Sequence, residues 1–208
     1  ERKELFSVEL DPSGAVAGLR NADTTKILDA YENRDPRLMA TVIVPYSIYK
    51  GCIGKTKPRD MLFALDHNLT GNENAGTIRN NKGWVSYLYR KFVVEYDLGG
   101  AISDRIHTPF EFPLIRYADV LLMLAEAYNE NNQLDKAIVE FNKVRARVNM
   151  PGLNSGPEWM AVGSKEQMQE RIRKERAMEF AGEGLRFSDL RRWGWEVASK
   201  ALNGVDAV

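Results

Sequence analysis

Apolar residues in the second part of the chain, residues 113–203, recur at the spacing of amphipathic helices. A first helix is expected to begin at Pro113, where the missing N–H of proline costs nothing. The polar run from Asn129 to Gln133 would form the turn that ends it. Its apolar positions, spaced i, i+3, i+4 and i+7, are Leu121, Leu124, Ala125 and Tyr128.

Three further helices are predicted after this turn. The second would end at Pro151, and the third would begin at Ser164, where Gln167 completes a capping box. Residues 182–184, with a glycine at each end, would stop the third helix, and a fourth would run to about Asn203. The apolar positions of the second and fourth helices are Leu134, Ala137, Ile138, Phe141, Val144 and Val148, then Leu190, Trp193, Val197 and Ala201.

Residues 1–110 lack this helical spacing and are predicted to be irregular, with a few short strands. Strand-forming residues gather at Met39–Tyr49, which Pro45 limits to a sheet edge or a bulge, and again at Trp84–Tyr96. The stretch from Gly51 to Gly83 is rich in Gly, Asn, Lys and Thr, and it is predicted to be a long loop. The predicted fold class is therefore mainly α, with a loop-rich, strand-bearing region at 1–110 and a helical region at 111–208.

The first predicted helix pair matches the tetratricopeptide pattern. That pattern places bulky, small and aromatic residues on one helix, then alanine and phenylalanine on the next, then proline. Only one such repeat fits, whereas repeats of this type need about three units to bury a continuous core. The pair is therefore expected to pack on the strand-and-loop region or on sequence outside this chain. The matching residues are Leu121, Leu124, Ala125, Tyr128, Ala137, Phe141 and Pro151.

Three blocks of sequence resemble the SusD/RagB family. Residues 113–130, PLIRYADVLLMLAEAYNE, resemble the helix that opens the C-terminal part of these proteins. Residues 173–194, RKERAMEFAGEGLRFSDLRRWG, are similar to the family's most recognisable block. Residues 33–38, NRDPRL, resemble its lead-in to a strand, and the order and spacing of the blocks also agree. The resemblance covers nearly all of the chain and corresponds to the C-terminal portion of one SusD-like domain.

The resemblance implies a mainly helical fold, in which tetratricopeptide-like helix pairs form a scaffold for ligand-binding loops. It also implies a surface-exposed lipoprotein of the outer membrane that binds oligosaccharide, polysaccharide or another nutrient without catalysis. Such proteins pass their ligand to a SusC-like TonB-dependent transporter and need no cofactor. The family's N-terminal half, with its lipid-anchor cysteine, and its closing segment are expected to lie outside this chain. The alternative function is a tetratricopeptide-type scaffold that binds a protein partner and no small ligand.

Composition narrows the remaining possibilities. Among 208 residues, 29 are Lys or Arg and 29 are Asp or Glu, so the net charge of zero argues against nucleic-acid binding by bulk electrostatics. A single cysteine, Cys52, allows neither an internal disulfide nor a zinc cluster. His67 and His107 lack nearby ligand partners in the sequence, so no metal site is predicted. No apolar run approaches the roughly 20 residues of a membrane span.

Sugar-binding chemistry is predicted around the long loop. Flat aromatic faces stack on the apolar face of a pyranose ring, while amide and guanidinium groups reach its hydroxyls, and ligand sites combine such walls with a few polar groups. An alternative for the aromatic residues is core packing, since aromatic side chains are common in strands for that reason. The candidate ligand-binding residues are Trp84, Tyr49, Arg79, Asn81 and Tyr87.

Glu175 and Glu179 lie one helical turn apart on a mostly apolar stripe. Their expected Cβ separation of about 5–6 Å is close to the carboxylate spacing of retaining glycosidases. The competing interpretation is structural, because carboxylates on such a stripe are costly unless arginines neutralise them. Pairing with an arginine of the following helix is expected, which leaves the protein without an enzymatic role. The arginines considered are Arg186, Arg191 and Arg192.

Overall fold

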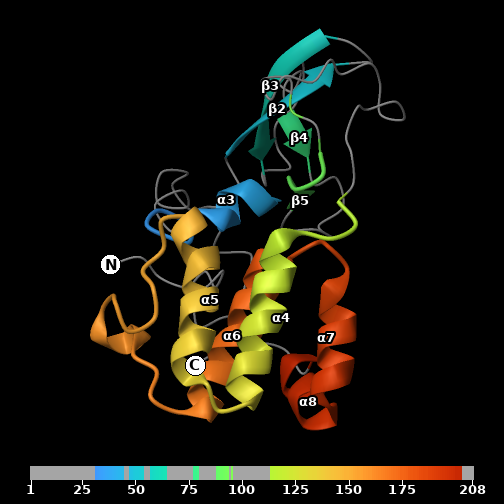
Figure 1. Ribbon diagram of the computed structural model, residues 1–208. Helices are drawn as coiled ribbons and strands as arrows, with labels where there is room; N and C mark the ends of the chain where they lie inside the picture. Colours follow the sequence, from blue (N-terminus) through green and yellow to red (C-terminus); the bar gives the residue numbers. More distant parts are fainter. Residues whose placement is uncertain are drawn as a thin grey trace, which may run out of the picture. The chain divides into compact units, whose positions relative to one another are not determined.

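The computed structural model describes residues 31–44, 47–53, 57–64, 77–79, 88–93, 95 and 113–202, with the backbone alone at 51–53, 57–64, 77–79 and 202. The chain divides into two compact units, Glu1–Phe112 and Pro113–Val208 (Figure 1). The described part of the first unit carries short strands, and that of the second is helical. No helix in the described part of the chain is both long and apolar enough to cross a membrane.

The described part of the first unit holds one short helix and two small sheets. Helix α3 leads directly into β1, which pairs antiparallel with β5. The other sheet has the order β2-β3-β4, with β2 antiparallel and β4 parallel to β3. The bounds are α3 Arg37–Thr41, β1 Val42–Ile43, β2 Ile48–Ile53, β3 Lys57–Ala64, β4 Thr77–Arg79 and β5 Leu88–Tyr89.

The predicted loop from Gly51 to Gly83 is wrong in part, because it contains β3 and β4 as well as the end of β2. The residue composition of this stretch does not indicate β3 and β4, because strand pairing depends on contacts between strands and only weakly on residue type. Pro58 in β3 faces Cys52 of β2 in the register, and the parallel pairing with β4 begins only at Leu62. Proline is tolerated there because, among the described strands, that end of β3 is a sheet edge.

The second unit is built from five α-helices in its described part. Helices α4 and α5 run antiparallel, with α6 beside them and with α7 and α8 following (Figure 1). Their apolar faces form one core that includes Leu122, Phe141, Met160, Met168 and Ile172. The bounds are α4 Tyr117–Glu130, α5 Leu134–Arg147, α6 Lys165–Glu179, α7 Leu185–Trp193 and α8 Trp195–Leu202, with a 3-10 turn η2 at Glu158–Met160.

The tetratricopeptide pattern holds in α4 and α5 at most of its positions. Leu121, Ala125, Ala137 and Phe141 are buried between the helices, as the small and bulky positions of the pattern require. Leu124 departs from the pattern, because it remains 37% exposed. The mainly α fold class predicted from the sequence is confirmed by the described elements.

Two helix boundaries differ from the prediction. The first helix begins at Tyr117, not at Pro113, because Arg116 has an extended backbone (φ −111°, ψ 144°) and caps the helix. The predicted fourth helix is two helices, α7 and α8, separated by Gly194 at φ 91° and ψ 170°. Only glycine adopts that backbone conformation at low cost, which explains why the helix breaks at this residue. The apolar spacing continues across the break and therefore does not indicate it.

The start of α6 agrees with the prediction. The Ser164 side chain accepts a hydrogen bond from the Gln167 backbone N–H at 3.2 Å, as an N-cap residue does. The Gln167 side chain accepts one from the Gly163 N–H at 2.8 Å, one residue before the cap. Two otherwise unpaired backbone donors are satisfied in this way, as in a capping box.

Candidate functional site

The predicted sugar-binding residues belong to the strand-bearing unit. Trp84, Asn81 and Tyr87 lie outside the described residues. Tyr49 is the second residue of β2, and Arg79 is the last residue of β4. The same three-stranded sheet therefore carries both described members of the candidate site.

The register places these two positions apart on that sheet. Tyr49 pairs with Met61 of β3, whereas Arg79 pairs with Ala64, three residues further along the same strand. Positions an odd number of residues apart on a strand belong to opposite faces. The Tyr49 side chain is half-buried and already has an interaction partner. The strand register alone thus does not join Tyr49 and Arg79 into one binding surface, and their ligand role stays a prediction.

Arg90 binds the first residue of β2, the strand that contains Tyr49, and the sequence did not indicate this role. Its Nη2 donates to the carbonyl oxygen of Ile48 at 2.6 Å, and its Nη1 donates to that of Met39 at 3.2 Å. Its Nε lies 2.8 Å from Oε1 of the buried Glu95, in an ion pair. One side chain thereby links the segment after β5 to the start of β2 and to α3. Nothing in the local sequence distinguishes Arg90 from its neighbour Lys91.

The helical unit carries a separate set of buried charges. Glu175 Oε2 pairs with Nη1 of Arg145 at 3.0 Å, and both side chains are 1% exposed. The Nε of Arg145 also donates to the carbonyl oxygen of Pro151 at 2.6 Å, so this guanidinium ties α5 to the turn after it and to α6. The pairing is structural, because an arginine matched to a buried carboxylate in this way compensates its charge and fixes its orientation.

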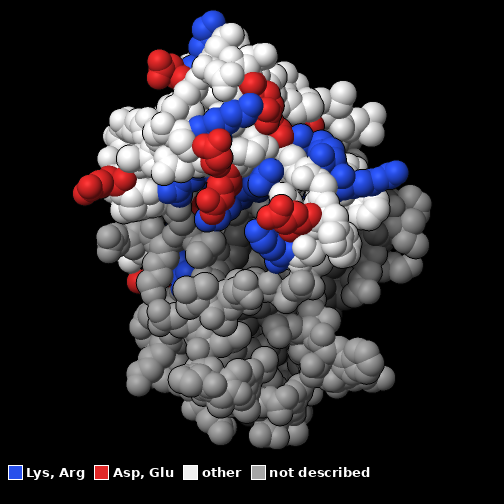
Figure 2. Space-filling model, turned by 90° about the horizontal axis from the view of Figure 1, so that it is seen from below, with Lys and Arg blue, Asp and Glu red and all other residues white. Residues whose placement is uncertain are grey.

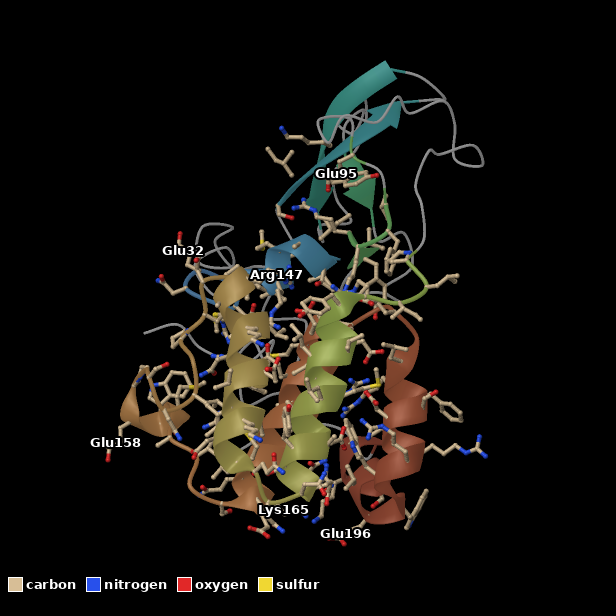
Figure 3. The ribbon with its side chains drawn as sticks, in the orientation of Figure 1. Glu32, Glu95, Arg147, Glu158, Lys165 and Glu196 are labelled. Atoms are coloured by element: carbon tan, nitrogen blue, oxygen red, sulfur yellow. The ribbon has the colours of Figure 1, made fainter. Side chains whose placement is uncertain are left out.

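Two arginines of the described helical unit pair with Glu179. Arg147, labelled at the end of α5 in Figure 3, reaches Glu179 at 2.8 Å, and Arg116 reaches it at 2.9 Å. Arg116 also pairs with Glu183 at 2.7 Å. Burial would lower the pKa of Arg116, but the hydrogen bonds and charges of Glu183 and Glu179 raise it above its ordinary value. Glu179 thus lies in a network of charges that joins the start of α4 to the ends of α5 and α6.

The expectation that Glu175 and Glu179 are neutralised by arginine is confirmed, but these arginines differ from the ones that the sequence suggested. They come from the preceding helix α5 and from Arg116, at sequence separations that helix spacing does not predict. Of the three residues considered, Arg192 instead pairs with Glu126 of α4 at 2.6 Å and with Asp189 at 3.1 Å.

Glu126 is the centre of a second polar cluster. Its carboxylate accepts hydrogen bonds from Arg192 at 2.6 and 2.8 Å, from Trp193 Nε1 at 2.7 Å and from Gln169 Nε2 at 2.9 Å. Burial alone would raise the pKa of Glu126, but these hydrogen bonds and the charge of Arg192 hold it below its ordinary value. Glu126 is therefore an ionised structural acceptor, and a general acid would need the opposite shift.

Arg176 joins three helices in the same region. Its Nε lies 2.8 Å from Asp189 of α7, and its Nη1 lies 2.7 Å from Asp119 of α4. On the face that Figure 2 shows, acidic and basic side chains are interspersed and do not gather by sign. No group of three His, Cys, Asp or Glu residues in the described part of the chain could hold a metal ion. Arg176 thus connects α6 to both α4 and α7 through ion pairs.

Comparison with known proteins relates the chain to one family. Residues 17–206 match the family model described as the SusD family. The SusD-like protein P38 of Formosa agariphila is 40% identical over 81 residues, which are 38% of this chain and 16% of that protein. The SusD-like protein P25 of the same organism is 43% identical over 82 residues, 39% of this chain and 15% of that protein.

Solved structures agree with this relationship. A SusD-like protein from Bacteroides fragilis superposes with a TM-score of 0.54 at 27% identity, over 84% of this chain and 31% of that one. A SusD superfamily protein from Bacteroides vulgatus gives 0.52 at 30% identity, over 88% of this chain and 35% of that one. The chain thus spans about a third of these relatives' length. Because the family model matches 190 of the 208 residues, from 17 to 206, the chain belongs to the SusD family.

Proposed function

We propose that this protein is a non-catalytic glycan-binding subunit of an outer-membrane uptake system. It captures oligosaccharide or polysaccharide at the cell surface and passes it to a SusC-like TonB-dependent transporter. A lipid anchor holds the complete protein to the membrane. The observation that carries this proposal is the family match over residues 17–206, together with a fold similar to SusD-like structures.

The chemistry of the strand-bearing unit supports a sugar ligand. Its candidate residues combine the aromatic rings of Tyr49, Trp84 and Tyr87 with the polar groups of Arg79 and Asn81. Such a set can cover the apolar face of a sugar ring and donate hydrogen bonds to its hydroxyls. Because each hydroxyl exchanges water for protein as its partner, the net gain per contact is small and the expected affinity is modest.

The buried carboxylates of the helical unit support a role without bond cleavage. A retaining glycosidase needs one carboxylic acid held protonated and one free nucleophile. Glu175 and Glu179 are instead 1% and 2% exposed and each is paired with arginine. Neither side chain is presented to a substrate.

The proposal is tested with a polysaccharide panel in affinity electrophoresis, on the complete protein and on its Trp84→Ala variant. Retardation of the wild-type protein by one glycan, lost in the variant with the fold intact, is the expected result. Trp159→Ala is the matched control, because Trp159 is an exposed tryptophan of the helical unit. Absence of retardation by every glycan would contradict glycan capture, and equal loss in both variants would contradict the assignment of Trp84.

A second candidate function is a helical scaffold that holds a protein partner and no small ligand. One observation favours it. Tyr117, Val120 and Leu124 follow steps of three and four along α4, so they share a face, and they are 72, 42 and 37% exposed. In an uptake system the partner of this face would be the transporter. The double variant Val120→Glu, Leu124→Glu would then abolish co-purification with the transporter. If the wild-type protein is retarded by a glycan but does not co-purify with the transporter, the scaffold function is contradicted.

A further inference from the structure

The indole ring of Trp193, the last residue of α7, is surrounded by guanidinium groups. The central guanidinium carbons of Arg192, Arg173 and Arg186 lie 4.7, 5.6 and 5.9 Å from the ring centroid. Arg173 comes from α6, while the other two come from α7 itself. Cation–π attraction holds guanidinium groups against a tryptophan face and leaves their N–H edges available to an acceptor.

These three arginines differ in their partners. Arg192 is matched by Glu126 and Asp189. Among the described residues, neither Arg173 nor Arg186 has a hydrogen bond or an ion pair to a carboxylate, and each contacts the Trp193 ring. The Nε of Arg173 is also buried without a hydrogen-bond partner. A buried donor without an acceptor costs free energy that a suitable ligand atom would recover.

The carboxylates near these arginines already have other cations as ion-pair partners. Asp119, Glu126 and Asp189 pair with Arg176 or Arg192. Glu170 acts on Arg173 through its charge, but its ion pair is with Lys174. Among the described residues, Arg173 and Arg186 are thus left without a carboxylate in direct contact.

The titration of the arginines agrees with this geometry. Burial would lower the pKa of Arg192, but the hydrogen bonds and charges of Glu126 and Asp189 raise it overall. Burial likewise lowers the pKa of Arg186, and there only the more distant charge of Asp189 opposes it, so the pKa stays below its ordinary value. The Arg186 side chain is exposed, and no anion is matched to it among the described residues.

We propose that Arg173 and Arg186, held against Trp193, form a binding site for one carboxylate group. A planar carboxylate matches the guanidinium fork, and it would supply the acceptor that these two arginines lack among the described residues. The carboxylate belongs to a small organic acid or to an acidic sugar, and these two sources share the chemistry of the site. This proposal does not depend on the capture of neutral glycans by the strand-bearing unit.

The test follows the Nε–H resonances of the arginine side chains by NMR during titration of the 208-residue protein at constant ionic strength. The probes are acetate, glucuronate and glucose. Saturable shifts of the Arg173 and Arg186 signals with acetate and with glucuronate, and none with glucose, are expected. Equal affinities would identify a site for the carboxylate alone, whereas tighter glucuronate binding would identify an acidic-sugar site.

Two variants separate specific binding from general attraction of anions. Arg186→Gln is expected to weaken binding by about tenfold, because one of two charge-assisted partners is lost. Arg191→Gln is the matched control, since Arg191 is an exposed arginine on the same helix and is expected to leave binding unchanged. Absence of saturation, an equal response to glucose, or equal weakening in both variants would overturn the proposal. Circular dichroism of each variant verifies that the helices remain folded.

Discussion

The two units of this protein are stabilised in different ways. In the helical unit, apolar residues at regular spacing form one core, and buried arginine–carboxylate pairs join helices across it. In the strand-bearing unit, the described strands are only two to eight residues long, and one arginine connects three segments. In the described part of the helical unit, buried ion pairs thus join neighbouring helices, while in the described part of the strand-bearing unit the contacts of Arg90 join residues far apart in the sequence. Ligand-binding surfaces are commonly found on segments of the second kind, which regular elements hold in place.

The largest expected effect is in the helical unit. Glu175→Gln removes the charge that faces the buried Arg145, and we expect a loss of about 3–5 kcal/mol in the free energy of unfolding. Urea denaturation followed by circular dichroism measures it. Glu170→Gln is the matched control, because the Glu170–Lys174 pair lies on the surface of the same helix and contributes within about 0.5 kcal/mol. A small loss in Glu175→Gln would show that the buried pair does not hold these helices together.

The corresponding variant of the strand-bearing unit is Arg90→Met. It deletes two hydrogen bonds to carbonyl oxygens and the ion pair with Glu95, so we expect a loss of about 2–3 kcal/mol. Hydrogen exchange should become faster in β1, β2 and β5 and should stay unchanged in α4 to α6. Arg90→Lys should recover little, because an ammonium group lacks the fork that bridges separate acceptors. Faster exchange throughout the helices would contradict the local role of Arg90.

The same difference explains which features the sequence predicts. The helices of the second unit follow from apolar spacing within single segments, and α5 and α6 end close to where that spacing and the turn residues place them. The pairing of Arg145 with Glu175 joins residues 30 positions apart, so no local pattern indicates it. Strands β3 and β4 could not be predicted for a related reason, because their pairing depends on residues that are neighbours in space and distant in sequence.

The candidate site is less predictable than the fold. Aromatic and amide residues near a glycine-rich stretch indicate sugar-binding chemistry, but the register of β2, β3 and β4 decides which of them share a face. That register separates the positions of Tyr49 and Arg79. The polar cluster around Glu126 and Trp193 could not be derived either, because its members come from three helices and meet only after the core has formed.

A smaller effect is expected at the start of α6. Ser164→Ala removes the side-chain acceptor for the Gln167 N–H, and we expect a loss of about 1 kcal/mol in the free energy of unfolding. Ser164→Asp should keep the stability, because a carboxylate also accepts this hydrogen bond and is favoured at a helix N-terminus. Thermal unfolding of the three proteins measures the difference. Equal stability of Ser164→Ala and wild type would mean that the core alone fixes where α6 begins.

The smallest expected effect is a pH dependence that arises at Glu126. Burial raises the pKa of Glu126, but the hydrogen bonds from Arg192, Trp193 and Gln169 lower it more. The pKa in the folded protein is therefore below its ordinary value. A carboxyl group with a lowered folded pKa stabilises the protein at pH values above its unfolded pKa, near 4.5, and this contribution is lost as the pH falls through the folded pKa. We therefore expect the stability difference between wild type and Glu126→Gln to shrink as the pH is lowered from about 6 to about 3. Urea denaturation of both proteins over this range measures that difference. Carboxylates that share no partner with Glu126 cancel because both proteins contain them, whereas Asp189 also pairs with Arg192. A difference independent of pH would show that Glu126 acts through its shape and hydrogen bonds alone, and that its charge does not help to hold α4 against α7.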